Sequence, residues 1–331
     1  MKLIIFKLNK NTKLIIKKYH IEAFFSYLKL KKNKNIILLN TFINLIMETK
    51  KSSSPISNYL KSQTFKNKNI IITGATGAIG SEVVQKFLDC GAKILGFIHH
   101  SNKINPDLAD YIKTGQLQFI QLDLNDSLRI TEKFKDAMIF LKGKLDILVF
   151  CHGKFFGGNV RTIKTDSFDQ NMNINVRANF HLLSLSVPFL KITKGNVVMV
   201  SSMEAKIVEK GEFLHALSKS MINSLVENSA LELASFGVRV NAVAPSFVTS
   251  NYRVNPLMRE KDNEEYLSQM KEYSLLGKRL AEPGDVADTI LFLASNEANF
   301  MTGEVVTVDC GFELNHDLSF LQEDEIMTVN P

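Results

Sequence analysis

The sequence has 331 residues, of which 45% are hydrophobic and 22% are charged, and its formal net charge is +6. These values are typical of a globular protein with a sizeable core, and no apolar tract is long enough to span a membrane. Residues 1–51 carry twelve lysines against two glutamates, so the rest of the chain is slightly acidic, and the basic total gives no reason to expect nucleic-acid binding.

Residues 1–66 are expected to be a basic, poorly ordered extension that ends near the Ser-Pro stretch 52–55. Three interpretations of it stay open. A mitochondrial presequence would be basic, but it would favour Arg and Ser. A basic helix could lie on a membrane surface, or translation could start at Met47. Cys90, Cys151 and Cys310 are widely spaced and show no disulfide pattern, which favours a reducing compartment. We expect a cytoplasmic protein, with a mitochondrial location as the alternative if the extension is a presequence.

The stretch from Asn69 to Gly80 organises the chain. Three isoleucines after Asn69 predict a buried strand, and a helical pattern opens at Ser81. Between them, Gly74, Gly77 and Gly80 are three residues apart. Glycines let the backbone approach a pyrophosphate, and a helix N-terminus offers free N–H groups to it. This pattern predicts a nucleotide-binding turn, and a side chain at Gly80 is expected to occupy the place of the pyrophosphate.

Short apolar segments then alternate with helical patterns as far as residue 308. The predicted strands are 69–73, 93–98, 117–122, 145–150, 196–201, 237–243 and 304–308. The predicted helices are 79–90, 127–142, 167–190, 212–235 and 284–295. Such alternation predicts a single doubly wound Rossmann-type α/β domain over 67–315, a seven-stranded parallel sheet with helices on both faces, and a tail at 316–331. Ligands are expected at the carboxyl ends of the strands.

Several motifs between residues 68 and 312 occur in the order typical of one family. They are Thr73 to Gly80, Leu122-Asp123-Leu124, Gly153, Asn175-Val176, Ser201-Ser202, Lys219, and Asn241-Ala-Val-Ala-Pro245. Together they resemble the short-chain dehydrogenase/reductases. Ala78 stands where the shorter members commonly have glycine, and Gly153 alone is kept from the usual Asn-Asn-Ala-Gly after the fourth strand.

The resemblance implies two sets of site residues. The expected catalytic residues are Asn175, Ser202, His215 and Lys219. The expected cofactor-binding residues are Gly74, Thr76, Gly77, Ala78, Ile79, Gly80, His99, Ser101, Asp123, Leu124, Gly153, Lys219, Pro245, Val248 and Ser250. Asp123 would hydrogen-bond adenine, although a turn-forming Asp fits the sequence as well. Asn175 would kink its helix and hold a water, although a buried amide bonded to a helix carbonyl is an alternative.

His215 is the main departure from the family. It stands thirteen residues after Ser202 and four before Lys219, where the family has its catalytic tyrosine. Imidazole can act as an acid or base near neutral pH, but its nitrogen lies roughly 1–2 Å short of a phenol oxygen, and proton transfer needs hydrogen-bond contact. Two functions therefore stay open: an NAD(P)-dependent oxidoreductase that interconverts a carbonyl and an alcohol, and a catalytically impaired dinucleotide-binding protein that acts as a sensor or partner scaffold.

The end of the second strand bears on the choice of cofactor. No acidic residue occurs between Gly91 and Pro106, whereas His99, Ser101 and Lys103 could face a phosphate. NADP is therefore favoured over NAD. No metal site is expected, because His99 and His100 have no further ligands near them in the sequence. Apolar residues on 167–190 and 212–235 exceed what one sheet face can cover. The family pairs these helices across two-fold axes, so the resemblance implies a homodimer or homotetramer.

Overall fold

The computed structural model describes residues 4–9, 12–16, 65–100, 104–249 and 260–315. The chain divides into two units, residues 1–52 and 53–331. In the first unit, β1 (Ile4–Asn9) and β2 (Thr12–Ile16) form an antiparallel pair, which was not among the predicted strands. Among the described residues, no helix has both the length and the apolar character needed to cross a bilayer.

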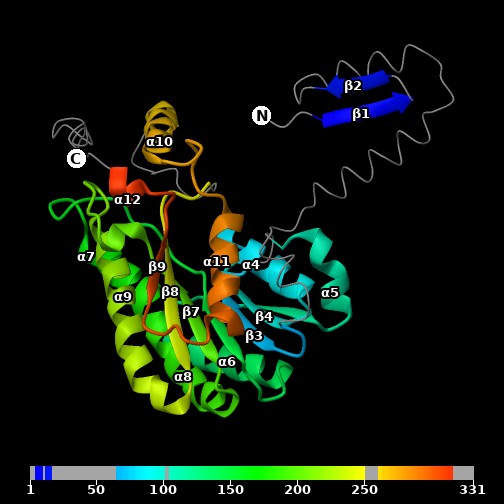
Figure 1. Ribbon diagram of the computed structural model, residues 1–331. Helices are drawn as coiled ribbons and strands as arrows, with labels where there is room; N and C mark the ends of the chain where they lie inside the picture. Colours follow the sequence, from blue (N-terminus) through cyan, green and yellow to red (C-terminus); the bar gives the residue numbers. More distant parts are fainter. Residues whose placement is uncertain (1–3, 10–11, 17–64, 101–103, 250–259, 316–331) are drawn as a thin grey trace. The chain divides into compact units, whose positions relative to one another are not determined.

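The second unit contains a parallel sheet of seven strands in the order β5-β4-β3-β6-β7-β8-β9 (Figure 1). The strands are β3 (Asn69–Thr73), β4 (Lys93–Ile98), β5 (Leu117–Gln121), β6 (Ile147–Phe150), β7 (Asn196–Val200), β8 (Arg239–Pro245) and β9 (Val305–Val308). The order reverses between β3 and β6, which places a topological switch point beside the glycine turn. The predicted doubly wound fold is confirmed.

Helices connect the strands and cover both faces of the sheet. They are α4 (Ala78–Asp89), α5 (Ala109–Lys113), α6 (Ser127–Phe140), α7 (Thr165–Met172), α8 (Ala178–Thr193), α9 (Phe213–Leu233), α10 (Glu260–Tyr273), α11 (Pro283–Ala294) and α12 (Phe312–Asn315). All five predicted helices are present. The short helices α5 and α12 were not predicted. Helix α10 was also missed, because its many charged residues leave no clear apolar periodicity.

Alternating side chains of each strand enter two separate cores. Ile70 and Ile72 of β3 pack with α4 and α11 on one face, and Ile71 packs with α6, α8 and α9 on the other. Both faces of β3 are buried, which explains why its sequence is continuously apolar rather than alternating. Figure 1 shows this order of layers, with α4 and α11 on one side of the strands and α8 and α9 on the other.

The helix expected over 167–190 is interrupted. The turn Asn173–Arg177 between α7 and α8 is π-helical, so one extra residue is accommodated without ending the helix.

The predicted strand ends also differ by one or two residues. β6 begins at Ile147 instead of 145, and β8 runs from Arg239 to Pro245 instead of 237–243. These shifts are of the usual size for element boundaries.

Candidate active site

The glycine turn joins β3 to α4 and leaves the start of the helix open. Gly74 has φ +63°, and a Cβ there would lie 2.8 Å from backbone atoms of His152, so both its conformation and its surroundings require glycine. Gly77 is the N-cap of α4 and makes no side-chain cap bond, while Gly77 and Ala78 are exposed. An uncapped, accessible helix N-terminus after a tight turn fits the pyrophosphate of a dinucleotide.

Gly80 has a different role from the one expected. A Cβ on Gly80 would lie 2.1 Å from the carbonyl oxygen of Gly74, inside the turn. The expectation that a side chain there would fill the place of the pyrophosphate was wrong, because the turn itself already occupies that space. Gly80 allows the first turn of α4 to pack against the end of β3, which is the packing role that a third glycine has in such motifs.

The residues expected at the adenosine end lie at the carboxyl ends of β4 and β5. Asp123 is exposed, and its Oδ1 accepts a hydrogen bond from the Asn125 backbone N–H at 2.9 Å, so it shapes the turn before α6. Leu124 beside it is half-buried. His99 is exposed and its ring lies 4.0 Å from that of His100, measured between centroids. Ser101 lies outside the described residues.

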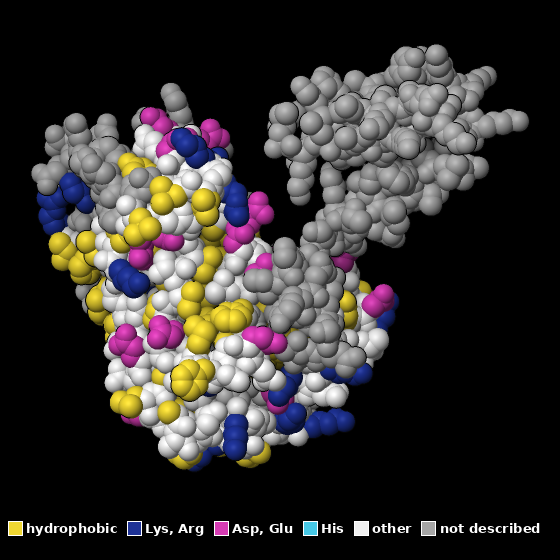
Figure 2. Space-filling model, in the orientation of Figure 1, with side chains coloured by type: hydrophobic (Ala, Val, Ile, Leu, Met, Phe, Trp, Pro, Cys, Tyr) yellow, Lys and Arg dark blue, Asp and Glu magenta, His cyan; other side chains and the backbone are white. Residues whose placement is uncertain are grey.

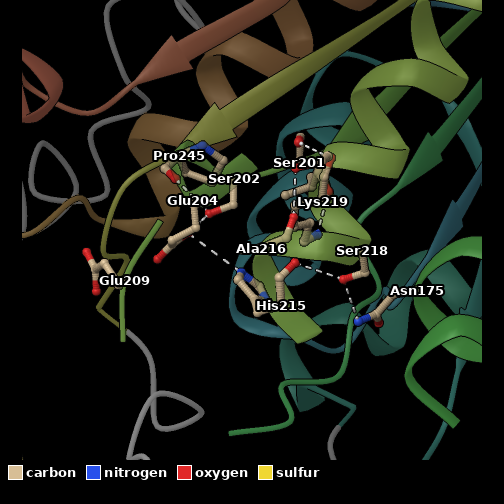
Figure 3. A network of polar contacts seen from close by, with 12 residues as sticks. Asn175, Ser201, Ser202, Glu204, Glu209, His215, Ala216, Ser218, Lys219 and Pro245 are labelled. Atoms are coloured by element: carbon tan, nitrogen blue, oxygen red, sulfur yellow. Dashed lines mark hydrogen bonds and ion pairs between the residues drawn. The ribbon is translucent and has the colours of Figure 1, made fainter. Parts of the chain in front are cut away.

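Ser202 follows β7 and lies beside the first turns of α9, which carry His215 and Lys219 (Figure 3). The Lys219 side chain is buried, and its Nζ donates to the Val200 carbonyl oxygen at 2.7 Å. The Ser202 hydroxyl contacts Glu204 and lies 3.4 Å from the Pro245 carbonyl oxygen. The structure thus brings the expected serine, histidine and lysine together at the carboxyl edge of the sheet.

Asn175 lies in the π-helical turn and supports the loop after β6. Its Oδ1 accepts from the Lys154 N–H at 2.8 Å, and its Nδ2 donates to the Lys154 carbonyl at 2.9 Å. A Cβ added to Gly153 would lie 3.8 Å from both the Asn175 Oδ1 and the Lys219 Nζ, so Gly153 adjoins both residues. The side-chain amide therefore bonds the loop backbone, which differs from the helix-carbonyl alternative considered from the sequence.

Two half-buried groups after β6 have pKa values shifted by their surroundings. Burial, with a smaller contribution from the nearby Lys219 charge, lowers the pKa of His152 to about 4. The His152 Nε2 lies 3.0 Å from the Ile174 carbonyl oxygen, and its Nδ1 lies 2.6 Å from the Thr73 hydroxyl. Because a carbonyl only accepts, we assign the proton to Nε2. Burial likewise raises the pKa of the Cys151 thiol to about 12.

Glu204 is a member of the site that the sequence did not reveal. It is 0% exposed in the short 3-10 turn Met203–Ala205, and its Oε2 contacts the Ser202 hydroxyl and lies 3.7 Å from the His215 Nε2. One oxygen from each of Glu204 and Glu212 and one ring nitrogen of His215 lie within 4.8 Å of one another. A single glutamate two residues after a serine carries no periodic or motif signal.

The segment after β8 and helix α10 lie near this edge. Val248 is buried and pairs with Ala281, and Ser250 lies outside the described residues. Residues of α10 pack with Met203, Phe247 and Phe312 in a separate apolar cluster. The Tyr266 hydroxyl of α10 donates to the Glu209 carboxylate at 2.9 Å. Helix α10 is therefore anchored to the segment that joins β7 to α9.

Comparison with known proteins agrees with this geometry. A family model described as enoyl-(acyl carrier protein) reductase matches residues 74–313. An uncharacterized oxidoreductase of Thermotoga maritima is 31% identical over 251 residues, which cover 75% of this chain and 98% of that protein. The chain belongs to the short-chain dehydrogenase/reductase family. It is thus an NAD(P)-dependent oxidoreductase, as the sequence motifs predicted.

Other members of the family show how widely the match extends. A 7alpha-hydroxysteroid dehydrogenase of Bacteroides fragilis is 29% identical over 265 residues, covering 76% of this chain and 96% of that protein. A tropinone reductase homologue of Arabidopsis thaliana is 28% identical over 255 residues, covering 76% and 93%. The solved aldohexose dehydrogenase of Thermoplasma acidophilum has a TM-score of 0.68 at 22% identity, covering 78% of this chain and 98% of that one, and so shares the fold.

Proposed function

We propose that this oxidoreductase interconverts a small carbonyl compound and its alcohol, with Ser202, His215, Lys219 and Asn175 as the working residues. The observation that supports this most directly is that Ser202 and His215 both lie against the same oxygen of Glu204 at the carboxyl edge of the sheet, the edge at which α4 also begins with an uncapped N-terminus. When bound, the nicotinamide supplies or accepts the hydride.

The remaining steps fall to the protein. The Ser202 hydroxyl orients the carbonyl oxygen of the substrate, and the His215 imidazole gives or takes the proton on that oxygen. The Lys219 Nζ is buried near Gly153 and would hold the nicotinamide ribose, as its position in the family implies. Asn175 ties the Lys154 backbone to the π-helical turn and so fixes the loop that borders the cofactor.

NADP is the proposed cofactor. The end of β4 carries His99 and no acidic residue as far as Pro106, so a 2′-phosphate would meet no repulsion there. Titration calorimetry with both dinucleotides tests this proposal, and tighter binding of NADPH than NADH by at least about tenfold, roughly 1.4 kcal/mol, is expected. Equal or reversed affinities would contradict it.

The proposed function is tested by NADPH oxidation with reactive diketones, ketones and quinones, over a range of pH. His215→Ala should lose about 10²–10⁴-fold in rate, the usual contribution of proton-transfer catalysis, while binding NADPH as before. Activity that survives this change would show that the proton donor lies elsewhere.

A dinucleotide-binding protein without turnover is the second candidate, and it is favoured by the histidine at the tyrosine position. If it is correct, the parent chain binds NADPH without oxidising it, and His215→Tyr gains activity because the phenol regains its reach beside Lys219. Parent, His215→Tyr and His215→Ala proteins that all bind NADPH and all fail to turn over any carbonyl would leave the binding role as the function.

The assembly proposed is a homodimer or homotetramer. Large hydrophobic side chains are exposed on α8 and α9, with Phe180 at 58% and Leu231 at 80%. Figure 2 shows hydrophobic side chains among acidic and basic ones on the face that carries β9, between α9 and α11.

The cytoplasm is the proposed location, and a mitochondrial presequence in residues 1–46 is the alternative. Comparing the localisation of the chain with and without these residues decides between them.

A further inference from the structure

The site contains a buried carboxylate that none of the family motifs accounts for. Glu204 is fully buried, and the same oxygen, Oε2, contacts the Ser202 hydroxyl and faces the His215 Nε2 at 3.7 Å. In Figure 3 its side chain extends from the end of β7 toward the imidazole. Glu212, at the N-cap of α9, brings a second carboxylate to within 4.8 Å.

A buried carboxylate is costly unless its charge is balanced. Moving an ionised carboxyl group out of water costs several kcal/mol in a real protein. The Ser202 hydroxyl stabilises it by a hydrogen bond but carries no charge. The imidazole of His215 can carry one, so a proton on that ring stabilises Glu204 and the ring together.

Other charged groups among the described residues also lie around His215. Lys219, one turn further along α9, would oppose a charge on the ring, but its Nζ is turned to the Val200 carbonyl oxygen. On the loop after β6, the Phe155 ring packs near the imidazole, while the Lys154 ammonium lies over Phe156. The Glu209 carboxylate is bonded to Tyr266 of α10. Of the charged groups among the described residues, the Glu204 and Glu212 carboxylates therefore lie close to a His215 ring nitrogen, and the Lys219 ammonium is bonded elsewhere.

We propose that Glu204 is a positioning residue that keeps His215 as an imidazolium beside Ser202, so that this histidine can deliver the proton that a tyrosine delivers elsewhere in the family. The proposal rests on the oxidoreductase function given above. In the reducing direction, the carbonyl carbon takes the hydride and the carbonyl oxygen takes the imidazolium proton. The products are the alcohol, the oxidised dinucleotide and a neutral His215, which recovers its proton from water.

The charge of His215 can be measured without turnover. NMR of the histidine ring carbons, with His215→Asn for assignment, gives the pH midpoint of each ring in the full chain. Because an opposite charge within about 4–6 Å typically moves a midpoint by about 1–3 pH units, Glu204→Gln should lower that of His215 by at least about one unit. Glu227→Gln, an exposed change on the same helix, should leave it unmoved. An unchanged midpoint in Glu204→Gln overturns the proposal.

Should Glu204→Gln fail to fold, the wild-type chain still decides. His215 should then titrate at least about one pH unit above the ordinary histidine value of about 6.5, and a midpoint at or below that value overturns the assignment.

Kinetic measurements then distinguish a positioning role of Glu204 from a purely structural one. With NADPH and a reactive diketone, Glu204→Gln should lower kcat by about 10²-fold, move the pH profile with the NMR midpoint, and leave the NADPH Kd unchanged. Glu204→Asp, which keeps a carboxylate, should recover part of the loss. A faster Glu204→Gln enzyme overturns the proposal, because the carboxylate would then occupy the place of the substrate oxygen. Activity that a chelator removes and Zn²⁺ restores overturns it as well.

The two proposals fail in different ways. A wild-type chain that shows the raised His215 midpoint but no turnover supports the pairing and contradicts the oxidoreductase function. A wild-type chain that turns over normally with an unperturbed His215 contradicts the role of Glu204 alone.

Discussion

Acidification should weaken the fold through His152, which is neutral in the folded chain. Burial lowers its folded pKa to about 4, against an ordinary value of 6.5. Below pH 6.5, His152 binds a proton in the unfolded chain but stays neutral in the folded chain. Its contribution to the free energy of unfolding is therefore complete above pH 6.5 and is lost as the pH drops toward 4. The complete loss amounts to about 3 kcal/mol in the free energy of unfolding, and about 2 kcal/mol of this is already lost at pH 5.

Urea unfolding followed by circular dichroism between pH 7 and pH 5 tests this expectation. In His152→Gln, the side-chain amide can still donate to the Ile174 carbonyl but cannot titrate. The wild-type chain should therefore lose about 2 kcal/mol more than this variant over that interval. His181→Gln is the matched control, because His181 is half-buried on α8 and bonded to Thr131. A stability difference between wild type and His152→Gln that does not change with pH would refute the reasoning.

Three further predictions follow from the packing around the site. Gly80→Ala should destabilise the cofactor-free protein by about 1–3 kcal/mol in thermal unfolding, because the added Cβ meets the Gly74 carbonyl. Gly284→Ala is the control and should not destabilise, because a Cβ there has no atom within 4 Å. Equal effects of the two changes would contradict the packing role of Gly80. Because the pKa of Cys151 is raised to about 12, its thiol should react with iodoacetamide at pH 8 at least about 100-fold more slowly than glutathione. Peptide mass spectrometry measures the rate, and a rate like that of glutathione would contradict the raised pKa. If the proposed oligomer forms through α9, Leu231→Glu should convert it to monomer in light scattering, and an unchanged oligomer mass would contradict an interface at this residue.

The sequence was informative wherever a local pattern had one structural solution. Three isoleucines before a glycine turn could only be a strand buried on both faces, and the structure places Ile70 and Ile71 in opposite cores. Helix α10 was missed because its apolar residues, such as Met270, are few and face a small separate cluster.

The site was predicted as far as the family motifs reach. Ser202, His215 and Lys219 were expected together and lie together. The placement of Glu204 could not be predicted, because it depends on the 3-10 turn Met203–Ala205, and a lone glutamate in a sequence is usually exposed to solvent. The function of Gly80 was misjudged for a similar reason, since only coordinates show which backbone atom a missing side chain would meet.

The π-helical turn at Asn173–Arg177 also sets the rotational phase of two helices. A regular helix turns by about 100° per residue, so one residue deleted there would rotate α8 by that angle relative to α7. The side of α8 that now faces the sheet, with Leu182 and Leu183, would swing toward solvent, and Asn175 would lose the Lys154 backbone. In this stretch the chain should therefore tolerate many changes of residue type and no change of length.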